Sequence, residues 1–417
     1  MTSEAKAEVL ERTSRYLSPA KVALFHAMGI DIVIGRREGY RIWDIDGREL
    51  LDLHLNGGTY NLGHGHPEVV DALRAGLDEG LDIGNHHFAS GPRAELASML
   101  SGLAPFEDAR VVFSSGGGEA VDVAIKSARR ATGRRRVVSV TGAYHGHTGL
   151  ALATGHERFS KPFLSEGDPA DYSRVPFDSL PAIEAELARG DVAAVILETI
   201  PATAGFVMPS EGYLAGVRAL CDEADALYVA DEVQTGLGRT GRLWGVESFG
   251  VVPDVVVTAK GLSGGVYPIA ATLLGPRAGA WLRTDSHGHV STFGGAELGC
   301  RVAMKVLEIT TRESTRENVE RTALALERGL GAMAERYPLL REVRQRGLVV
   351  GLRFSRDDGG IHVMRALHQL GAWAIVAGFD YGALQVKPGL LWDEATTREA
   401  LELLERAIAD VQRTLGS

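Results

Sequence analysis

Two adjacent carboxylates, Asp231 and Glu232, stand where an apolar run ends in the segment YVADEVQTGLGRTG (228–241). Burying an unpaired carboxylate costs several kcal/mol, so this placement calls for a reason. The glycines that follow, GLGRTG (236–241), formally match G-x-G-x-x-G. Nicotinamide binding is nevertheless not favoured. That motif needs its glycines directly after the strand and at the start of a helix, and RLWGVESFG is a poor helix.

A phosphate-sized anion site is predicted in SSGGGEAVDVAIKSARR (114–130). A helix is expected to begin at Gly116, Gly117 and Gly118, immediately after an apolar strand. Glycines let the backbone approach a ligand closely, and the free N–H groups and dipole of a helix N-terminus attract anions. A tight strand-to-helix turn without a ligand is the alternative that this segment leaves open.

Lys260 lies between an apolar strand and a glycine-rich loop in PDVVVTAKGLSGG. Only seven of the 44 basic residues are lysines, so an amine in such a place calls for a reason. An amine, unlike a guanidinium, can form a Schiff base, and burial lowers its pKa. The alternative is a lysine whose ammonium group reaches from a strand end to water.

The bulk composition is that of a soluble globular protein: 417 residues, 45% hydrophobic and 24% charged. A formal charge of -10 argues against nucleic acid as the main partner. Cys221 and Cys300 suggest neither a disulfide framework nor a metal site. The N-terminal MTSEAKAEVLERTSRYL predicts a polar helix without an export signal, and no apolar run approaches the length of a membrane span. We expect a cytoplasmic protein with no membrane association.

Short apolar runs alternate with helix-length segments through the middle of the chain, which predicts an α/β fold around a mostly parallel central sheet. Residues 39–55 alternate around Asp46-Gly47 and predict an antiparallel hairpin. We expect a large domain over 61–304, and a smaller α+β domain formed by 305–417 with the N-terminal segment 1–60. The predicted central strands are ARVVFSS (109–115), RRVVSVTG (135–142), VAAVILE (192–198), ALYVADE (226–232) and DVVVTAK (254–260).

Five segments occur in the order and rough spacing of one family, the class III pyridoxal-phosphate aminotransferases, which the chain resembles over roughly residues 39–412. The resemblance implies the fold type I architecture, pyridoxal 5'-phosphate as cofactor, small amine and carbonyl substrates, and a homodimer with shared active sites. The matching segments are SGGGEAVDVAIKSAR, AYHGHTGLALATG, DEVQTGLGRTG, TAKGLSGG and STFGG.

The resemblance assigns the catalytic positions to Lys260 and Asp231. Lys260 would hold the cofactor as a Schiff base and then move the substrate Cα proton. Asp231 would pair with the protonated pyridine nitrogen, which keeps the ring an electron sink. Glu232 is interpreted as structural.

The other cofactor contacts follow from the same resemblance. Tyr144 would stack on the ring with His145 beside it, Val233 would make the apolar contact on one ring face, and Gln234 would bind the phenolic oxygen. Gly118 differs from the family, which more often has a small hydroxyl residue or alanine there, so a phosphate contact is expected to be lost. The remaining positions are Gly117, Glu198, and Ser291 with Thr292, which in the family reach the phosphate from the neighbouring subunit.

Three positions depart from the family where it binds substrate carboxylates. Thr203 replaces a glutamate and Gln385 replaces an arginine, which together form a gate in the family; His147 stands where relatives acting on acetylated ornithine have arginine. Losing both members of a buried ion pair costs less than losing one. If 383–387 is a strand, Lys387 shares a face with Gln385 and could supply a cation instead; a solvated Lys387 is the alternative.

These features favour a transaminase acting on an amine without a conventionally gripped α-carboxylate, such as an amino sugar, diamine or other ω-amine. The runner-up is a lyase that eliminates phosphate from a phosphorylated amine; racemisation, decarboxylation and a catalytically silent scaffold carry less weight. Pocket walls are expected from LNGGTYN (55–61) and GNHHFAS (84–90), with Tyr60, His87 and Phe88 as candidates.

Overall fold

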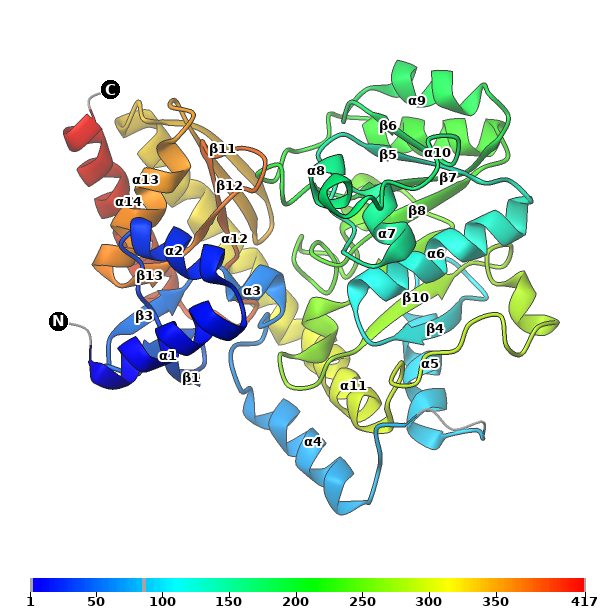
Figure 1. The fold of residues 1–417 in the computed structure, drawn as a ribbon, viewed down its shortest axis with the longest axis horizontal. Coiled ribbons are helices and arrows are strands. Elements are labelled where there is room, and N and C mark those ends of the chain that lie inside the picture. The colour runs from blue at the N-terminus through cyan, green and yellow to red at the C-terminus, as the bar shows by residue number, and fades with distance from the viewer. Residues whose placement is uncertain (1–2, 85–87, 416–417) are drawn as a thin grey trace.

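The computed structural model describes residues 3–84 and 88–415 and is built around a seven-stranded sheet (Figure 1). The strand order is β4-β10-β9-β8-β7-β5-β6. Strand β10 is antiparallel to both of its neighbours, whereas the pairs among β9, β8, β7, β5 and β6 are all parallel. The strands are β4 (Arg110–Ser114), β5 (Arg136–Val140), β6 (Tyr172–Val175), β7 (Val192–Glu198), β8 (Leu227–Asp231), β9 (Val255–Thr258) and β10 (Ala270–Leu274).

The sheet is buried on both faces because alternate residues of its strands enter different hydrophobic cores. In β7, Ala194 and Ile196 pack into the core that contains helix α6, whereas Val195 and Leu197 pack with helices α9 and α10. The helices of this part of the chain are α4 (Pro67–Asp78), α5 (Gly91–Gly102), α6 (Gly117–Thr132), α7 (Gly149–Thr154), α8 (Glu157–Ser160), α9 (Leu180–Leu187), α10 (Tyr213–Glu223) and α11 (Glu297–Thr311), with 3-10 turns at 161–163, 245–249, 260–263 and 280–283.

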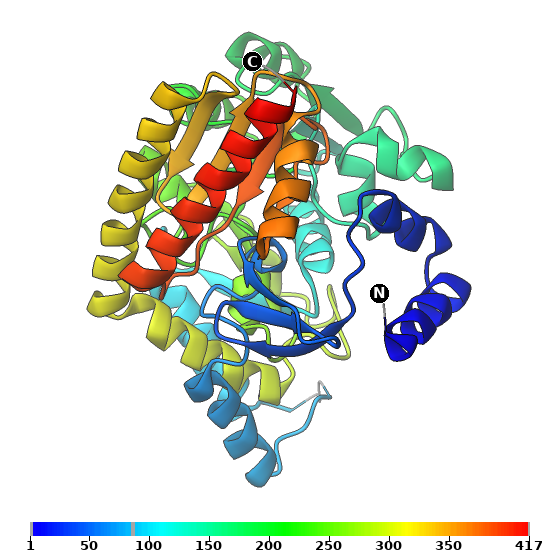
Figure 2. The same ribbon diagram turned by 90° about the vertical axis from the view of Figure 1, so that its left-hand side faces the viewer.

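The two chain ends fold together beside this sheet (Figure 1). Strand β13 (Ala372–Trp373) pairs in parallel with β3 (Glu49–Asp52), and one hydrophobic core joins residues such as Leu51 and Leu53 to Leu384 and Leu404. Helices α1 and α2 lie to one side (Figure 2). The other elements are α1 (Glu4–Tyr16), α2 (Pro19–Ala27), β1 (Ile34–Glu38), β2 (Arg41–Asp44), α3 (Leu55–Gly58), α12 (Glu313–Arg336), β11 (Leu340–Arg346), β12 (Val349–Phe354), α13 (Gly359–Leu370), β14 (Ile375–Val376), β15 (Ala383–Val386) and α14 (Glu394–Leu415).

The five predicted central strands, the hairpin and the helix after 116 are confirmed. Strands β6 and β10 were not predicted. The division at 304/305 stays a prediction, and α11 continues through it. No helix in the described ranges is both long and apolar enough to cross a membrane.

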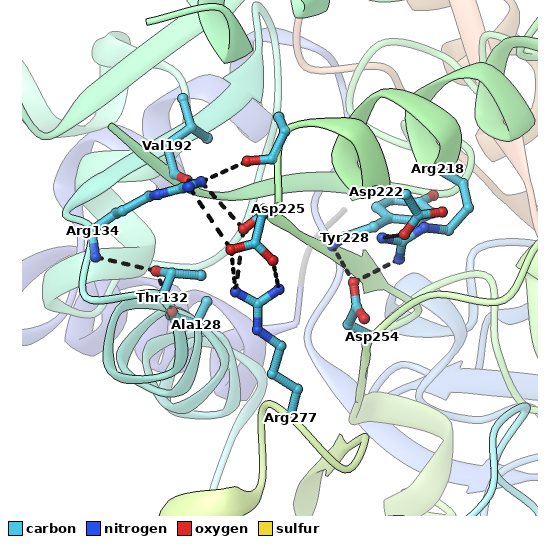
Figure 3. Close-up of polar contacts among 11 residues, drawn as sticks. Ala128, Thr132, Arg134, Val192, Arg218, Asp222, Asp225, Tyr228, Asp254 and Arg277 are labelled. Carbon is cyan, nitrogen blue, oxygen red and sulfur yellow. Dashed lines mark hydrogen bonds and ion pairs between the residues drawn. The ribbon is translucent and has the colours of Figure 1, made fainter. Parts of the chain in front are cut away.

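Arginine and aspartate side chains form ion pairs and hydrogen bonds at the end of the sheet where strands β7, β8 and β9 begin (Figure 3). Arg218 donates to Asp254 Oδ2 at 2.6 Å, and the same oxygen accepts the Tyr228 N–H at 2.7 Å. Arg277 pairs with Asp225 at 2.6 Å. Ion pairs therefore hold the strand beginnings, whereas ligands of such sheets bind at the opposite edge, where the strands end.

A fully buried arginine joins the sheet to the region formed by the chain ends. Arg239, 1% exposed, donates to Asn61 Oδ1 at 2.9 Å and to the backbone oxygens of Leu348 and Pro388. One guanidinium thus fixes three distant segments of chain around the loop that follows Asp231.

Replacing Arg239 by leucine is expected to destabilise the protein by about 3 kcal/mol or more, because several buried acceptors lose their donor. Thermal unfolding followed by circular dichroism measures the effect. Arg242→Leu, in the same loop but exposed, is the control and should change little. Equal melting temperatures for both variants would contradict the role given to Arg239.

Candidate active site

A cavity of about 340 Å³ opens at the edge where the parallel strands end. Residues that follow β4, β5, β7, β8 and β9 reach it together because the carboxyl ends of parallel strands share one edge. Its lining residues are Thr59, Ser115, Gly116, Gly117, Gly118, Tyr144, His145, Gly146, Glu198, Ile200, Asp231, Val233, Gln234, Thr235, Ala259, Lys260, Ser263, Pro268 and Ile269.

The N-terminus of α6 forms one end of the cavity. A Cβ at Gly117 would lie 3.4 Å from the Val233 methyl groups, which places Val233 directly beside this turn. A Cβ at Gly118 would lie 2.9 Å from Thr148 Oγ1, closer than real Cβ atoms come. The neighbouring threonine therefore occupies the space that a side chain at 118 would need, which explains the glycine at that position.

Asp231 also lines the cavity, paired with a histidine. Its Oδ2 is 2.8 Å from Nδ1 of His145, and its Oδ1 accepts the Val233 N–H at 3.1 Å. The His145 side chain is fully buried, and its Nε2 has no partner within the described residues. The carboxylate is thus held by one ring and one amide.

Glu232 points away from the cavity into a closed set of donors. Its oxygens accept from the hydroxyls of Thr199 and Thr235, both at 2.6 Å, and from the amides of Gly245 and Val246, both at 2.8 Å. Burial raises the pKa of Glu232 despite these bonds. The two adjacent carboxylates have different environments, and the interpretation of Glu232 as structural agrees with its four bonds.

Lys260 has a backbone φ of 42°, in the left-handed region that is unfavourable for lysine. A Cβ at Gly57 would lie 3.1 Å from Lys260 Cε, and the φ of 71° there also favours glycine, so Gly57 fits closely against the lysine stem. Burial lowers the pKa of Lys260, while the charges of Asp231 and Glu198 raise it. A lowered amine pKa leaves more of the base form available near neutral pH.

Glu198, at the end of β7, accepts the Tyr144 N–H at 2.9 Å and the Ala202 N–H at 3.2 Å. Burial is the largest influence and raises the pKa of Glu198 to about 7; the Asp231 charge acts in the same direction and His145 opposes it. Near neutral pH this carboxyl can therefore either hold or release a proton.

Several predicted residues lie outside the cavity. Tyr60 packs against Gly265 and stacks on His64 with ring centres 4.0 Å apart. His147 is exposed, with its ring 5.4 Å from that of Tyr144. Thr203 accepts the Phe379 N–H through its backbone oxygen at 3.0 Å. The others outside it are Phe88, which is 85% exposed, Ser291 and Thr292; His87 lies outside the described residues.

Gln385 and Lys387 also lie outside the cavity lining, but they contact each other. Strand β15 ends at Val386, and Lys387 Nζ donates to Gln385 Oε1 at 2.6 Å, so the shared face is confirmed. The alternative of a solvated Lys387 is wrong: the residue is 2% exposed. Its burial depends on the segment before residue 55, because the Lys387 N–H binds the Leu53 oxygen at 2.7 Å.

The sequence did not single out Thr59, Ile200, Pro268 or Ile269 as cavity residues. Only Thr59 carried a signal, since it lies in the LNGGTYN segment. The others reach the cavity through the sheet order, and Pro268 and Ile269 precede the unpredicted strand β10.

Comparison with known proteins identifies the family. The model of the family "Aminotransferase class-III" matches residues 25–408. The chain belongs to the class III aminotransferases. An uncharacterized aminotransferase of Archaeoglobus fulgidus is 50% identical over 391 residues, which cover 93% of this chain and 91% of that protein.

Two solved structures of aminotransferases match nearly the whole chain. N-acetylornithine aminotransferase of Stenotrophomonas maltophilia is 32% identical, with a TM-score of 0.79 and coverage of 94% and 100% of the two chains. An ornithine aminotransferase of Toxoplasma gondii, with partial occupancy of PLP at its active site, is 25% identical, with a TM-score of 0.86 and coverage of 98% and 95%. This chain is an α/β aminotransferase of fold type I that uses pyridoxal 5'-phosphate in transamination. Nothing among these relatives supports the lyase alternative.

The described residues fit this cofactor in size and in charge. The α6 N-terminus offers amides to a phosphate, and Asp231, which lines the same cavity, offers a carboxylate to a protonated ring nitrogen. Gln234 Oε1 is buried without a partner in the described structure, so this side-chain amide is available to a ligand.

The raised pKa of Glu198 predicts a pH-dependent stability of the cofactor-free protein. A carboxyl whose folded pKa of about 7 exceeds its ordinary 4.5 contributes stability that is complete below pH 4.5 and is lost as pH rises through 7. The shift corresponds to roughly 3 kcal/mol. Glu198→Gln should therefore lack this loss, and urea unfolding at pH 5 and pH 8.5 measures it.

The exposed Glu184→Gln variant is the control and should keep the wild-type dependence. If wild type and Glu198→Gln lose the same stability between the two pH values, Glu198 does not titrate in this range.

Proposed function

We propose that this aminotransferase moves the amino group of an amine without a conventionally gripped α-carboxylate to a keto acid or aldehyde, with Lys260 as its catalytic amine. The observation that carries the proposal is the buried Lys260 amine in a cavity that fits the cofactor. Burial lowers the pKa of this amine, and the charges of Asp231 and Glu198 raise it. The substrate class is supported by Thr203 and Gln385, two neutral residues where the family pattern has a glutamate and an arginine.

Bound pyridoxal 5'-phosphate supplies an electron sink for negative charge at the substrate Cα. Asp231, oriented by His145 and the Val233 amide, would hold the ring nitrogen in its protonated form. Val233 and Tyr144, which line the cavity, would contact the cofactor ring, and the α6 N-terminus would bind the phosphate. Lys260 would hold the cofactor through its amine and, once released, would move the proton at the substrate Cα.

Lys260→Ala is expected to lower turnover by at least about a thousandfold, because the variant lacks both the covalent attachment and the proton-transferring amine. A screen of diamines, amino sugars and other ω-amines with pyruvate or 2-oxoglutarate measures activity, and borohydride reduction followed by peptide mass spectrometry locates the attached cofactor. The exposed Lys21→Ala is the control.

An unmodified Lys260 after reduction, or cofactor that no amine donor converts to its amine form, would contradict the proposed function. Preference for an α-amino acid such as glutamate over every ω-amine would contradict the proposed substrate class alone.

The same family pattern supports a homodimer in which Ser291 and Thr292 serve the neighbouring subunit. Both lie outside the cavity of their own chain, and the segment around them exposes apolar side chains, with Val290 62% and Phe293 54% exposed. Exposed apolar clusters of this kind are typical of protein interfaces.

Subunit mixing tests the shared site. Lys260→Ala and the double variant Ser291→Ala/Thr292→Ala should each be weak alone, whereas their co-expressed mixture should regain up to about a quarter of wild-type activity, since one site of each mixed dimer is intact. A mixture no more active than the average of its parents would contradict sharing. The dimer itself is measured by sedimentation.

A further inference from the structure

Two fully buried basic residues lack an acidic partner. Buried Lys6 pairs with Asp44 at 2.5 Å, and buried Arg136 pairs with Asp191 at 3.0 Å. Lys387 and Arg239, by contrast, have no carboxylate oxygen within 4.0 Å in the described part of the chain. Arg239 is saturated by neutral acceptors that link three segments of the fold. Lys387 has no such structural task.

The surroundings of Lys387 are polar but neutral. Its Nζ lies 2.6 Å from Gln385 Oε1 and 3.4 Å from His54 Nδ1, and it stands 5.0 Å from the centre of the Phe206 ring. These three neighbours of the amine are an amide, an imidazole and an aromatic ring, none of them an acid. The amine can therefore still bind an anion as its charged partner. A buried lysine kept without an acid costs stability, so it is expected to have a function.

This cluster lies next to the catalytic lysine. The backbone oxygen of His54 accepts the Gly57 N–H at 3.1 Å, and Gly57 is the residue that fits against the Lys260 stem. The positive charge of Lys260 lowers the pKa values of both His54 and Lys387, in addition to the larger effect of burial. The turn that begins at His54 thus contacts Lys387 at one end and Lys260 at the other, so the cluster lies beside the catalytic lysine.

We propose that Lys387, Gln385 and His54 form an oxyanion-binding subsite that receives the anionic group of the keto acid or amino acid exchanging the amino group. This inference rests on the proposed function and names the part of the site that holds the carbonyl partner. It explains how a chain with Gln385 in place of an arginine accommodates an acid: the cation is supplied two residues later on the same strand face.

The subsite couples anion binding to proton uptake. The groups that face Lys387 are Gln385, His54 and Phe206 in contact, with the more distant charges of Lys260, Arg239 and Asp52. Burial, Lys260 and Arg239 hold the pKa of Lys387 well below its ordinary value, while Asp52 raises it. An arriving anion raises this pKa, so the amine takes up a proton as the anion binds, and affinity falls as pH rises.

The test is calorimetric titration of the cofactor-loaded protein with maleate, an unreactive dicarboxylate, in two buffers of different ionisation enthalpy. Wild type should bind maleate with a net uptake of protons at pH 8. Lys387→Met should weaken binding at least about tenfold and abolish the uptake. Lys387→Arg, which keeps a permanent charge, should bind maleate without proton uptake. Lys21→Met is the control.

Unchanged affinity and proton uptake in Lys387→Met would overturn the proposal. Inorganic phosphate is titrated in parallel: tighter binding of phosphate than of maleate, again lost in Lys387→Met, assigns the subsite to phosphorylated partners, and the reverse assigns it to carboxylates. Retention of the cofactor absorption band shows that each variant is folded. Maleate binding needs no turnover, so a failure of the proposed transamination leaves this result unaffected.

Discussion

The arrangement of the active site depends on the balance of charges that the chain buries at one edge of a sheet. Asp231, Glu198 and Lys260 lie around one cavity, and burial alone would favour the neutral forms of Glu198 and Lys260. Their mutual attraction opposes that tendency for Lys260, and His145 opposes it for Glu198. Such a balance requires positions fixed by rigid elements, which the parallel strands supply because their ends meet at one edge.

Backbone strain occurs at the same place. Lys260 has a φ of 42°, and Leu55 and Asn56, which begin the turn beside it, have values of 48° and 47°. A left-handed conformation costs such residues about 1–2 kcal/mol each. The cost is offset by tertiary structure, since Leu55 is fully buried and Gly57 fits against the lysine stem. The turn and the lysine thus hold each other in place.

The sequence predicted those parts of the site that lie in single continuous segments. Asp231, Lys260 and the glycines before α6 each follow a strand directly, so the local pattern placed them at the end of a strand. Residues such as Pro268 and Ile269 could not be predicted, because they reach the cavity only through the order of strands, in which β10 lies between β4 and β9. The burial of Lys387 was equally out of reach, since it depends on residues 53–54, more than three hundred positions earlier in the chain.

The departures from the family pattern become coherent once the positions of the basic groups are known. Lys260, Lys387 and Arg239 surround the segment from His54 to Asn61, and none of them has a carboxylate oxygen within 4.0 Å in the ranges that the structure describes. A glutamate at position 203 and an arginine at 385 would neutralise each other, whereas Thr203 and Gln385 leave the charge of this region to Lys387 and Lys260. The positive charge that Lys387 acquires when it takes up a proton can then be balanced by an anionic group on the substrate.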